Sequence, residues 1–168
     1  GYYTAVSVGW VWGYSYSVTY NNKICDNLIY NIGQGWLSDM GGIYTLGNQP
    51  GTVISGNVIH NVAADPDEGG YGGWGIYLDE GSSYITVEKN LAYSCGSNAY
   101  HLNYGSYNTV RNNIFVLSGE SQFKTVSNLG RVTPDDGGKK TIDLFNNIIL
   151  TDGGTRAVSN ISDKAAWN

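Results

Sequence analysis

Two short glycine-rich segments each bring a carboxylate close to a tyrosine. Residues 39–44 read Asp-Met-Gly-Gly-Ile-Tyr, and residues 74–79 read Trp-Gly-Ile-Tyr-Leu-Asp. If the two segments are neighbouring strands, Asp39 and Asp79 form a pair of carboxylates. Such a pair can cleave a glycosidic bond when one carboxyl is protonated to release the leaving oxygen and the other is ionised to attack the sugar or activate water.

The second segment has the alternation of a β-strand. Ile76 and Leu78 fall on one face and Tyr77 and Asp79 on the other, because successive strand residues point to opposite sides of a sheet. We expect the aliphatic pair to face the core and the tyrosine and carboxylate to lie on the open face. A turn-forming role for Asp79 is the alternative, since Asp-Glu-Gly-Ser is favourable turn sequence.

An internal repeat supplies the elements that would position these residues. Five segments align on an asparagine, with an aliphatic residue three positions before it and an apolar residue two positions after it. The asparagines are Asn27, Asn57, Asn90, Asn113 and Asn147. Apolar and polar residues alternate before each asparagine, and this alternation changes phase after it. The pattern indicates a strand, a tight bend and a second strand. Stacked amides at such a bend can satisfy one another and the turn backbone.

A third strand in each repeat contains the Gly-Ile-Tyr pattern or its equivalent. Its copies are residues 5–9, 42–46, 75–79, 99–103 and, more weakly, 122–126. Three short strands per coil, with like residues stacked on like, predict an all-β, right-handed parallel β-helix of about five coils.

Stacking of the third strands predicts two outward columns of side chains. The first is Ser7, Tyr44, Tyr77, His101 and Lys124, and the second is Gly9, Leu46, Asp79, Asn103 and Val126. Coils lie about 4.8 Å apart, so Asp79, Tyr44, Tyr77, His101 and Asn103 should share one sugar-sized patch. Asp39 lies at the corner of the coil beneath, at a separation compatible with the roughly 5–9.5 Å of paired catalytic carboxylates.

Insertions and aromatic residues gather near this patch. Segments 33–41 and 63–73 enter at one corner and should wall a groove, with 118–121 at the same corner of a later coil, whereas 127–140 enters elsewhere as a surface loop. Trp10, Trp12, Trp36 and Trp74 lie in or beside these corners, where flat rings can cover the apolar faces of sugars. Trp74 is equally consistent with a packing role. Glu80 is an alternative candidate for a catalytic acid.

Composition excludes several classes of partner. The chain has 168 residues, is 41% hydrophobic and carries a net charge of −5, which fits one globular domain, residues 1–168, and argues against nucleic-acid binding. No apolar run is long enough to span a membrane. Asp65, Asp67 and Glu68 lack the alternating spacing of a calcium loop, so we expect no metal and no cofactor.

The cysteines and the ends of the chain give two further expectations. Cys25 and Cys95 fall on different positions of the repeat, the first outward and the second inward, so we expect no disulfide. Solenoids normally cover their terminal coils, and this chain starts inside a strand and stops inside a coil. We therefore expect a piece of a longer protein, truncated at both ends, or a chain whose open ends pack against another.

Segments 38–44 and 72–82 resemble the central part of the parallel β-helix glycoside hydrolases of family 141, which includes a xylanase and an α-L-fucosidase acting on pectin. The resemblance runs over most of residues 5–165 and implies that Asp39 and Asp79 are the catalytic pair. It also implies that Glu120 is retained from the substrate-binding site. The polar residues and arginines that relatives carry after His101 and Glu120 are replaced here.

These observations leave three hypotheses for function. The first is a secreted or periplasmic glycoside hydrolase, or a fragment of one, that acts on plant cell-wall polysaccharide such as xylan or pectin side chains. Its catalytic residues would be Asp39 and Asp79, and its substrate-binding residues would be Tyr44, Trp74, Tyr77, Glu80, His101, Asn103 and Glu120. The second is a polysaccharide lyase, for which the outward columns offer only Lys124 as a base. The third is a non-catalytic carbohydrate-binding or structural solenoid.

Overall fold

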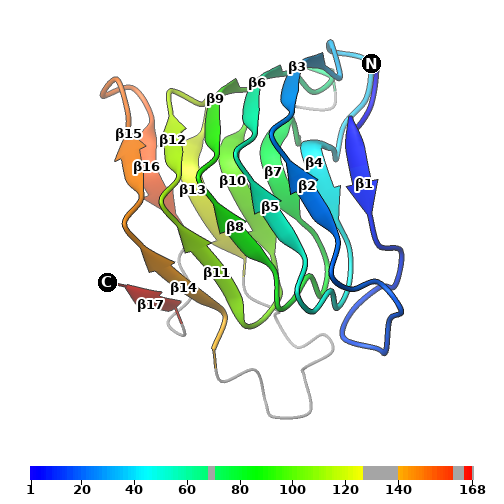
Figure 1. The fold of residues 1–168 in the computed structure, drawn as a ribbon. Coiled ribbons are helices and arrows are strands. Elements are labelled where there is room, and N and C mark those ends of the chain that lie inside the picture. Colours follow the sequence, from blue (N-terminus) through cyan, green and yellow to red (C-terminus); the bar gives the residue numbers. More distant parts are fainter. Residues whose placement is uncertain (68–70, 127–139, 161–164, 168) are drawn as a thin grey trace.

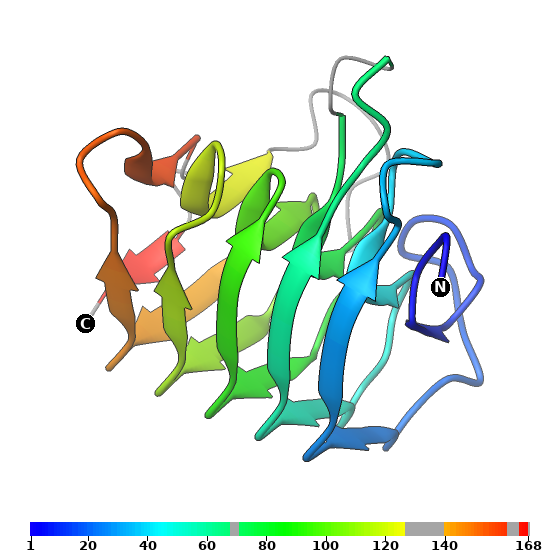
Figure 2. The ribbon, with the colours of Figure 1, turned by 90° about the horizontal axis from the view of Figure 1, so that it is seen from above.

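The chain forms a right-handed parallel β-helix, as the repeat predicted (Figures 1 and 2). The structure is a computed structural model, and it describes residues 1–67, 71–126, 140–160 and 165–167. Every strand pairing among these residues is parallel, in three sheets that we call A, B and C. Each of the first five coils contributes one strand to each sheet, so the expected succession of three short strands per coil is confirmed.

The strands of sheet A run in the order β1 (Val6–Val8), β4 (Gly41–Thr45), β7 (Trp74–Leu78), β10 (Asn98–Asn103), β13 (Ser121–Val126) and β16 (Arg156–Ser159). Sheet B consists of β2 (Lys23–Cys25), β5 (Val53–Ser55), β8 (Thr86–Glu88), β11 (Asn108–Arg111), β14 (Ile142–Phe145) and β17 (Ala165–Trp167). Sheet C consists of β3 (Leu28–Ile32), β6 (Val58–Val62), β9 (Leu91–Cys95), β12 (Ile114–Val116) and β15 (Ile148–Leu150).

The core is a stack of like positions from successive coils. On sheet A, Ile43 pairs with Ile76, which pairs with Tyr100, which pairs with Phe123. All four side chains are fully buried, and the rings of Tyr100 and Phe123 stack with centroids 4.6 Å apart. Cys95 also belongs to this core, and both cysteines are free, as expected.

The bend between sheets B and C depends on the stacked asparagines. In each coil the residue just before the asparagine has a left-handed backbone, for example Lys89 at φ 56° and Asn112 at φ 56°. The Asn90 side chain accepts hydrogen bonds from the backbone and the amide of Asn57 at 3.0 and 2.9 Å. It donates to the Ile54 carbonyl at 2.9 Å and to the Asn113 amide oxygen at 3.0 Å. The predicted amide ladder is therefore confirmed.

The two long connections between sheets C and A leave from one corner. Residues 33–40 join β3 to β4 and residues 63–73 join β6 to β7, whereas β9 and β10 are joined by residues 96–97 alone. The insertions therefore lie side by side at the start of sheet A, as predicted (Figure 2). Most of the expected surface loop, 127–140, lies outside the described residues.

No helix in the described part of the chain is long and apolar enough to cross a membrane.

Removing one amide from the middle of the ladder should destabilise the fold. Asn90→Ala leaves the backbone N–H of Asn57 and the carbonyl of Ile54 buried without their partners, which costs about 1–3 kcal/mol for each group. We expect a loss of at least about 2 kcal/mol in the free energy of unfolding measured with urea. Asn27→Ala, at the exposed end of the ladder, is the control and should cost about 1 kcal/mol or less. Equal losses in the two variants would contradict this account.

Candidate functional site

The tyrosines of the two glycine-rich segments lie on adjacent strands in register. Tyr44 pairs with Tyr77, Tyr77 pairs with His101, and His101 pairs with Lys124. Ser7 of β1 precedes Tyr44 in the same row. The first predicted outward column is therefore confirmed, and Asp79 follows β7 directly beside it.

The sequence analysis predicted that the side chains of this column lie on an open face of the sheet. This prediction is wrong for most of them. Tyr77 is 1% exposed, Asp79 4%, His101 4% and Tyr44 9%. The reason is that the outward side chains are large enough to pack on one another. The rings of Trp74 and Tyr77 lie 4.2 Å apart and those of Tyr44 and Tyr77 5.2 Å apart, so they form a second apolar cluster outside sheet A.

Asp79 is the hydrogen-bonding centre of this cluster. Its Oδ2 accepts from the Tyr44 hydroxyl at 2.6 Å. Its Oδ1 accepts from the Tyr77 hydroxyl and from the Asn103 amide, both at 2.8 Å. Three donors directed at one carboxyl suit an ionised carboxylate, which only accepts hydrogen bonds. The position is thus built to hold a negative charge away from bulk water.

The Tyr77 hydroxyl connects the two predicted catalytic carboxylates. Its oxygen lies 2.8 Å from Asp79 Oδ1 and 3.2 Å from Asp39 Oδ1. The Oδ1 atoms of the two aspartates can therefore lie no farther apart than the sum of these two distances. That limit is comparable with the roughly 5–9.5 Å over which carboxylate pairs act on glycosidic bonds. The structure thus brings together the two residues that the sequence analysis paired.

Asp39 differs from Asp79 because it is exposed. Its backbone is left-handed, with φ 54°, and its N–H donates to the Tyr71 carbonyl of the neighbouring corner loop. Partial burial raises the pKa of the Asp39 carboxyl, the charges of Asp79 and Glu80 raise it further, and the Tyr77 hydrogen bond opposes them. The pair therefore contains one buried carboxyl that accepts three hydrogen bonds and one exposed carboxyl whose pKa is raised.

Glycine is required where the two corner loops meet. Gly72 has φ 95°, and a Cβ there would lie 2.6 Å from the backbone nitrogen of Asp39. Any side chain at this position would therefore move Asp39 relative to the strands. The close approach of the loops is part of what positions the exposed carboxylate.

Trp74 and His101 form the packed end of the cluster. Their rings stack at 4.4 Å with an interplanar angle of 10°, and the Trp74 indole N–H donates to Asn98. Burial, with a smaller effect of Lys124, lowers the pKa of His101 to about 3, so the imidazole is neutral. Its Nδ1 has no hydrogen-bond partner among the described residues. Trp74 is 2% exposed, a packing position, so substrate binding by Trp74 stays a prediction.

Two further predicted binding residues lie at the rim. Glu80 accepts a hydrogen bond from the Tyr104 hydroxyl. Glu120 lies at the corner, where it accepts from the Ser97 hydroxyl at 3.2 Å and pairs with Lys124 at 3.4 Å. Asn103 donates to Asp79, and contact of these three residues with substrate stays a prediction.

The sequence analysis missed two tyrosines close to the pair. The Tyr3 hydroxyl donates to the Asp39 carbonyl at 3.0 Å. Burial raises the pKa of Tyr71, and Asp39, Asp79 and Glu120 add to that increase. Tyr71 was detectable because it lies in a corner insertion, but no sequence pattern placed Tyr3 there.

In the described part of the chain, no three His, Cys, Asp or Glu side chains lie close enough together to hold a metal ion.

Comparison with known families supports the fold without specifying an activity. A family model described as the right-handed beta helix region matches residues 9–149. The chain belongs to this family of right-handed parallel β-helices. Searches of curated proteins and of solved structures found no match. The fold occurs in carbohydrate-active enzymes and in proteins without catalytic activity, so the reaction must be argued from the site.

Removing the bridging hydroxyl should change the titration of Asp39. In Tyr77→Phe the hydrogen bond that lowers the pKa of Asp39 is lost, so this pKa should increase. Carboxyl-detected NMR titration measures the shift. Tyr84→Phe, on a partly exposed ring outside the cluster, is the matched control and should leave the Asp39 titration unchanged. An unchanged or lower pKa of Asp39 in Tyr77→Phe would show that the Tyr77 hydroxyl does not stabilise the ionised form of Asp39.

The buried imidazole should make stability depend on pH. The unfolded chain binds a proton at His101 near pH 6.5, whereas the folded chain does so only near pH 3. Between these values the unfolded state holds more protons, so the stability contributed by neutral His101 is lost as the pH falls. We expect His101→Phe, which keeps a ring against Trp74, to flatten the dependence of unfolding free energy on pH in this window. Identical slopes for variant and wild type would contradict the assignment.

Proposed function

We propose that the chain is a glycoside hydrolase, or part of one, in which Asp39 and Asp79 are the catalytic pair. The observation that carries the proposal is the contact of both carboxylates with one hydroxyl, that of Tyr77. Two carboxyls brought this close in unequal surroundings acquire different protonation states, which glycosidic cleavage requires.

The surroundings suggest which carboxyl has which role. Asp39 is exposed and its pKa is raised, so it can present a proton to the leaving oxygen as the general acid. Asp79 accepts three hydrogen bonds, which suits the ionised partner. Because Asp79 is 4% exposed, a substrate that reaches it must displace at least one of its three hydrogen-bond donors.

Exposed aromatic residues near the ends of sheet A support a carbohydrate substrate. Trp10 is 72% exposed, Trp12 58% and Trp36 69%. The segment that carries Trp10 and Trp12 reaches the turn after β7, where the Gly13 N–H donates to the Glu80 carbonyl. Trp36 lies on the opposite corner loop, next to Tyr2. Flat exposed rings on both sides of a carboxylate pair are suited to the apolar faces of sugar rings.

The resemblance to glycoside hydrolase family 141 gives the finer part of the proposal. On that basis the substrate is a plant cell-wall polysaccharide, such as xylan or the side chains of pectin, and the protein is secreted or periplasmic. This resemblance supports the same two aspartates as the catalytic pair.

A non-catalytic carbohydrate-binding solenoid is the second candidate. It is favoured by the burial of Asp79, whose three hydrogen bonds hold the outer cluster together. A polysaccharide lyase has less support, because Lys124, the base available in the outward column, is paired with Glu120.

Substituting either aspartate tests the proposal. Asp39→Asn and Asp79→Asn should each reduce the release of reducing sugar from xylan or pectin by about 100-fold or more. Asp26→Asn is the control, because this residue lies at the bend between β2 and β3, and its left-handed backbone also suits asparagine. Its activity should match wild type. Wild-type activity in both site variants would reject the carboxylate pair, and substrate binding without release of reducing sugar by the wild-type chain would favour the non-catalytic candidate.

A further inference from the structure

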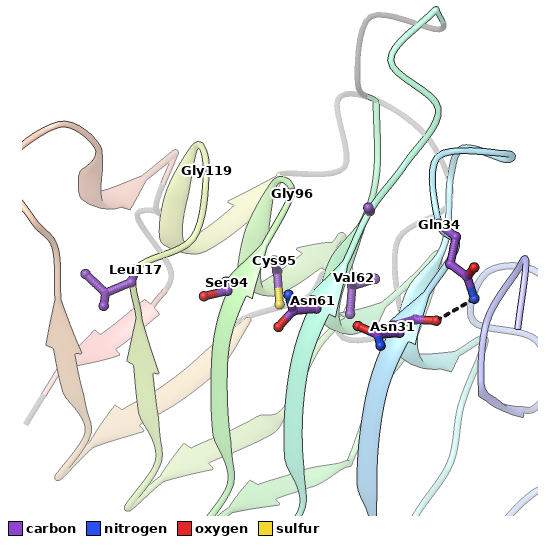
Figure 3. A pocket seen from close by; sticks show the side chains of 10 residues that line it. Asn31, Gln34, Asn61, Val62, Ser94, Cys95, Gly96, Leu117 and Gly119 are labelled. Carbon is purple, nitrogen blue, oxygen red and sulfur yellow. Dashed lines mark hydrogen bonds between the residues drawn. The ribbon is translucent and has the colours of Figure 1, made fainter.

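A second candidate site lies at the other side of the corner loops, where the strands of sheet C end. It is a pocket of about 560 Å³, which we call the sheet C pocket. Figure 3 shows Asn31, Asn61 and Ser94 in a row across three neighbouring coils, with Gln34 at one end and Leu117 at the other. None of the residues described for the carboxylate pair lines this pocket.

The row exists because three neighbouring coils each have a left-handed residue at this position. Asn31 has φ 53°, Asn61 φ 54° and Ser94 φ 51°. The turn breaks the strand alternation, so that Tyr30 and Asn31 are both exposed although they are consecutive. Each coil therefore presents two outward side chains here instead of one. The second is a polar residue in three successive coils.

Aromatic rings form a parallel row beside the polar one. The rings of Tyr30 and His60 are stacked 5.4 Å apart, and those of His60 and Tyr93 are stacked 4.7 Å apart. His60 Nδ1 lies 2.6 Å from the Asn61 side-chain oxygen and fixes the orientation of that amide.

Hydrogen-bonding capacity in the polar row is unused. The Asn31 amide and the Ser94 hydroxyl have no side-chain hydrogen bond among the described residues, and the Asn61 NH₂ group is also unpaired there. None of the ten residues that line the pocket is charged. Leu117, which is 48% exposed, adds apolar surface. Neutral donors and acceptors beside apolar contacts match a hydroxylated, uncharged ligand and not a phosphate or a carboxylate.

Two of the residues that line the pocket in the later coils are glycines at close approaches of the backbone. A Cβ at Gly119 would lie 2.2 Å from the Gly96 carbonyl oxygen, and one at Gly96 would lie 3.2 Å from that of Val62. Gln34 and Ala63, which belong to the corner loops, line the pocket on the side of the earlier coils.

We propose that the sheet C pocket binds a neutral oligosaccharide at a site separate from the carboxylate pair. The polar side chains repeat every 4.7–4.9 Å along the solenoid axis, which is close to the length of one sugar residue. Successive sugars of a chain lying along the axis would therefore meet successive coils. This binding does not depend on the proposed hydrolase activity, and the two sites lie on opposite sides of the same corner loops.

The test is an NMR titration of the ¹⁵N-labelled chain with xylohexaose, and separately with hexagalacturonic acid as an acidic probe. It is carried out in the Asp39→Asn background so that turnover cannot consume the probe. The blocking variant combines Asn31→Gly, Asn61→Gly and Ser94→Gly, because glycine accepts the left-handed backbone and removes only the side chains. The matched control combines Asn112→Gly and Asn146→Gly, which are left-handed and exposed at a different bend.

We expect xylohexaose to shift the amide resonances of Asn31, Asn61 and Ser94, with at least tenfold weaker binding in the blocking variant and unchanged binding in the control. Hexagalacturonic acid should bind more weakly than xylohexaose. The proposal is overturned if xylohexaose leaves these resonances unmoved, if the blocking variant binds as tightly as the control, or if the acidic probe is preferred. Shifts confined to the residues around Asp39 and Asp79 would support the carboxylate site alone and reject the second one.

Discussion

The structure depends on keeping every coil in register with the next. A parallel β-helix buries its apolar residues only between neighbouring coils, so a slip of one residue would turn a whole strand inside out. The asparagine ladder prevents such a slip, because each amide oxygen accepts two hydrogen bonds from the preceding coil. A left-handed residue before each asparagine makes the bend at which the amides meet.

The same register creates the candidate site. Because Tyr44, Tyr77 and His101 occupy equivalent places in successive coils, side chains far apart in the sequence become a continuous cluster. Their size has a second effect, since large rings on adjacent strands shield one another and the carboxylate among them. Asp79 is consequently buried on the outside of the solenoid, and Asp39, on a corner loop, is the carboxyl that remains in contact with solvent.

Repetition explains how much could be predicted from the sequence. The fold, the strand register and the pairing of Asp39 with Asp79 followed from recurring positions such as Asn57 and Asn90, because a repeated unit must repeat its contacts. The burial of Tyr77 could not be predicted, since it depends on how its ring packs against Trp74 of its own strand and Tyr44 of the neighbouring coil. The polar row at Asn31 and Asn61 was also missed, because strict alternation assigns no outward place to two consecutive residues.

The shared hydroxyl of Tyr77 has one consequence for the behaviour of the carboxylate pair. A hydroxyl carries a single proton, which the Oδ1 atoms of Asp39 and Asp79 must share. Strengthening one of these hydrogen bonds therefore weakens the other. Any molecule that displaces the phenol will remove a hydrogen-bond partner from both carboxyls in a single step.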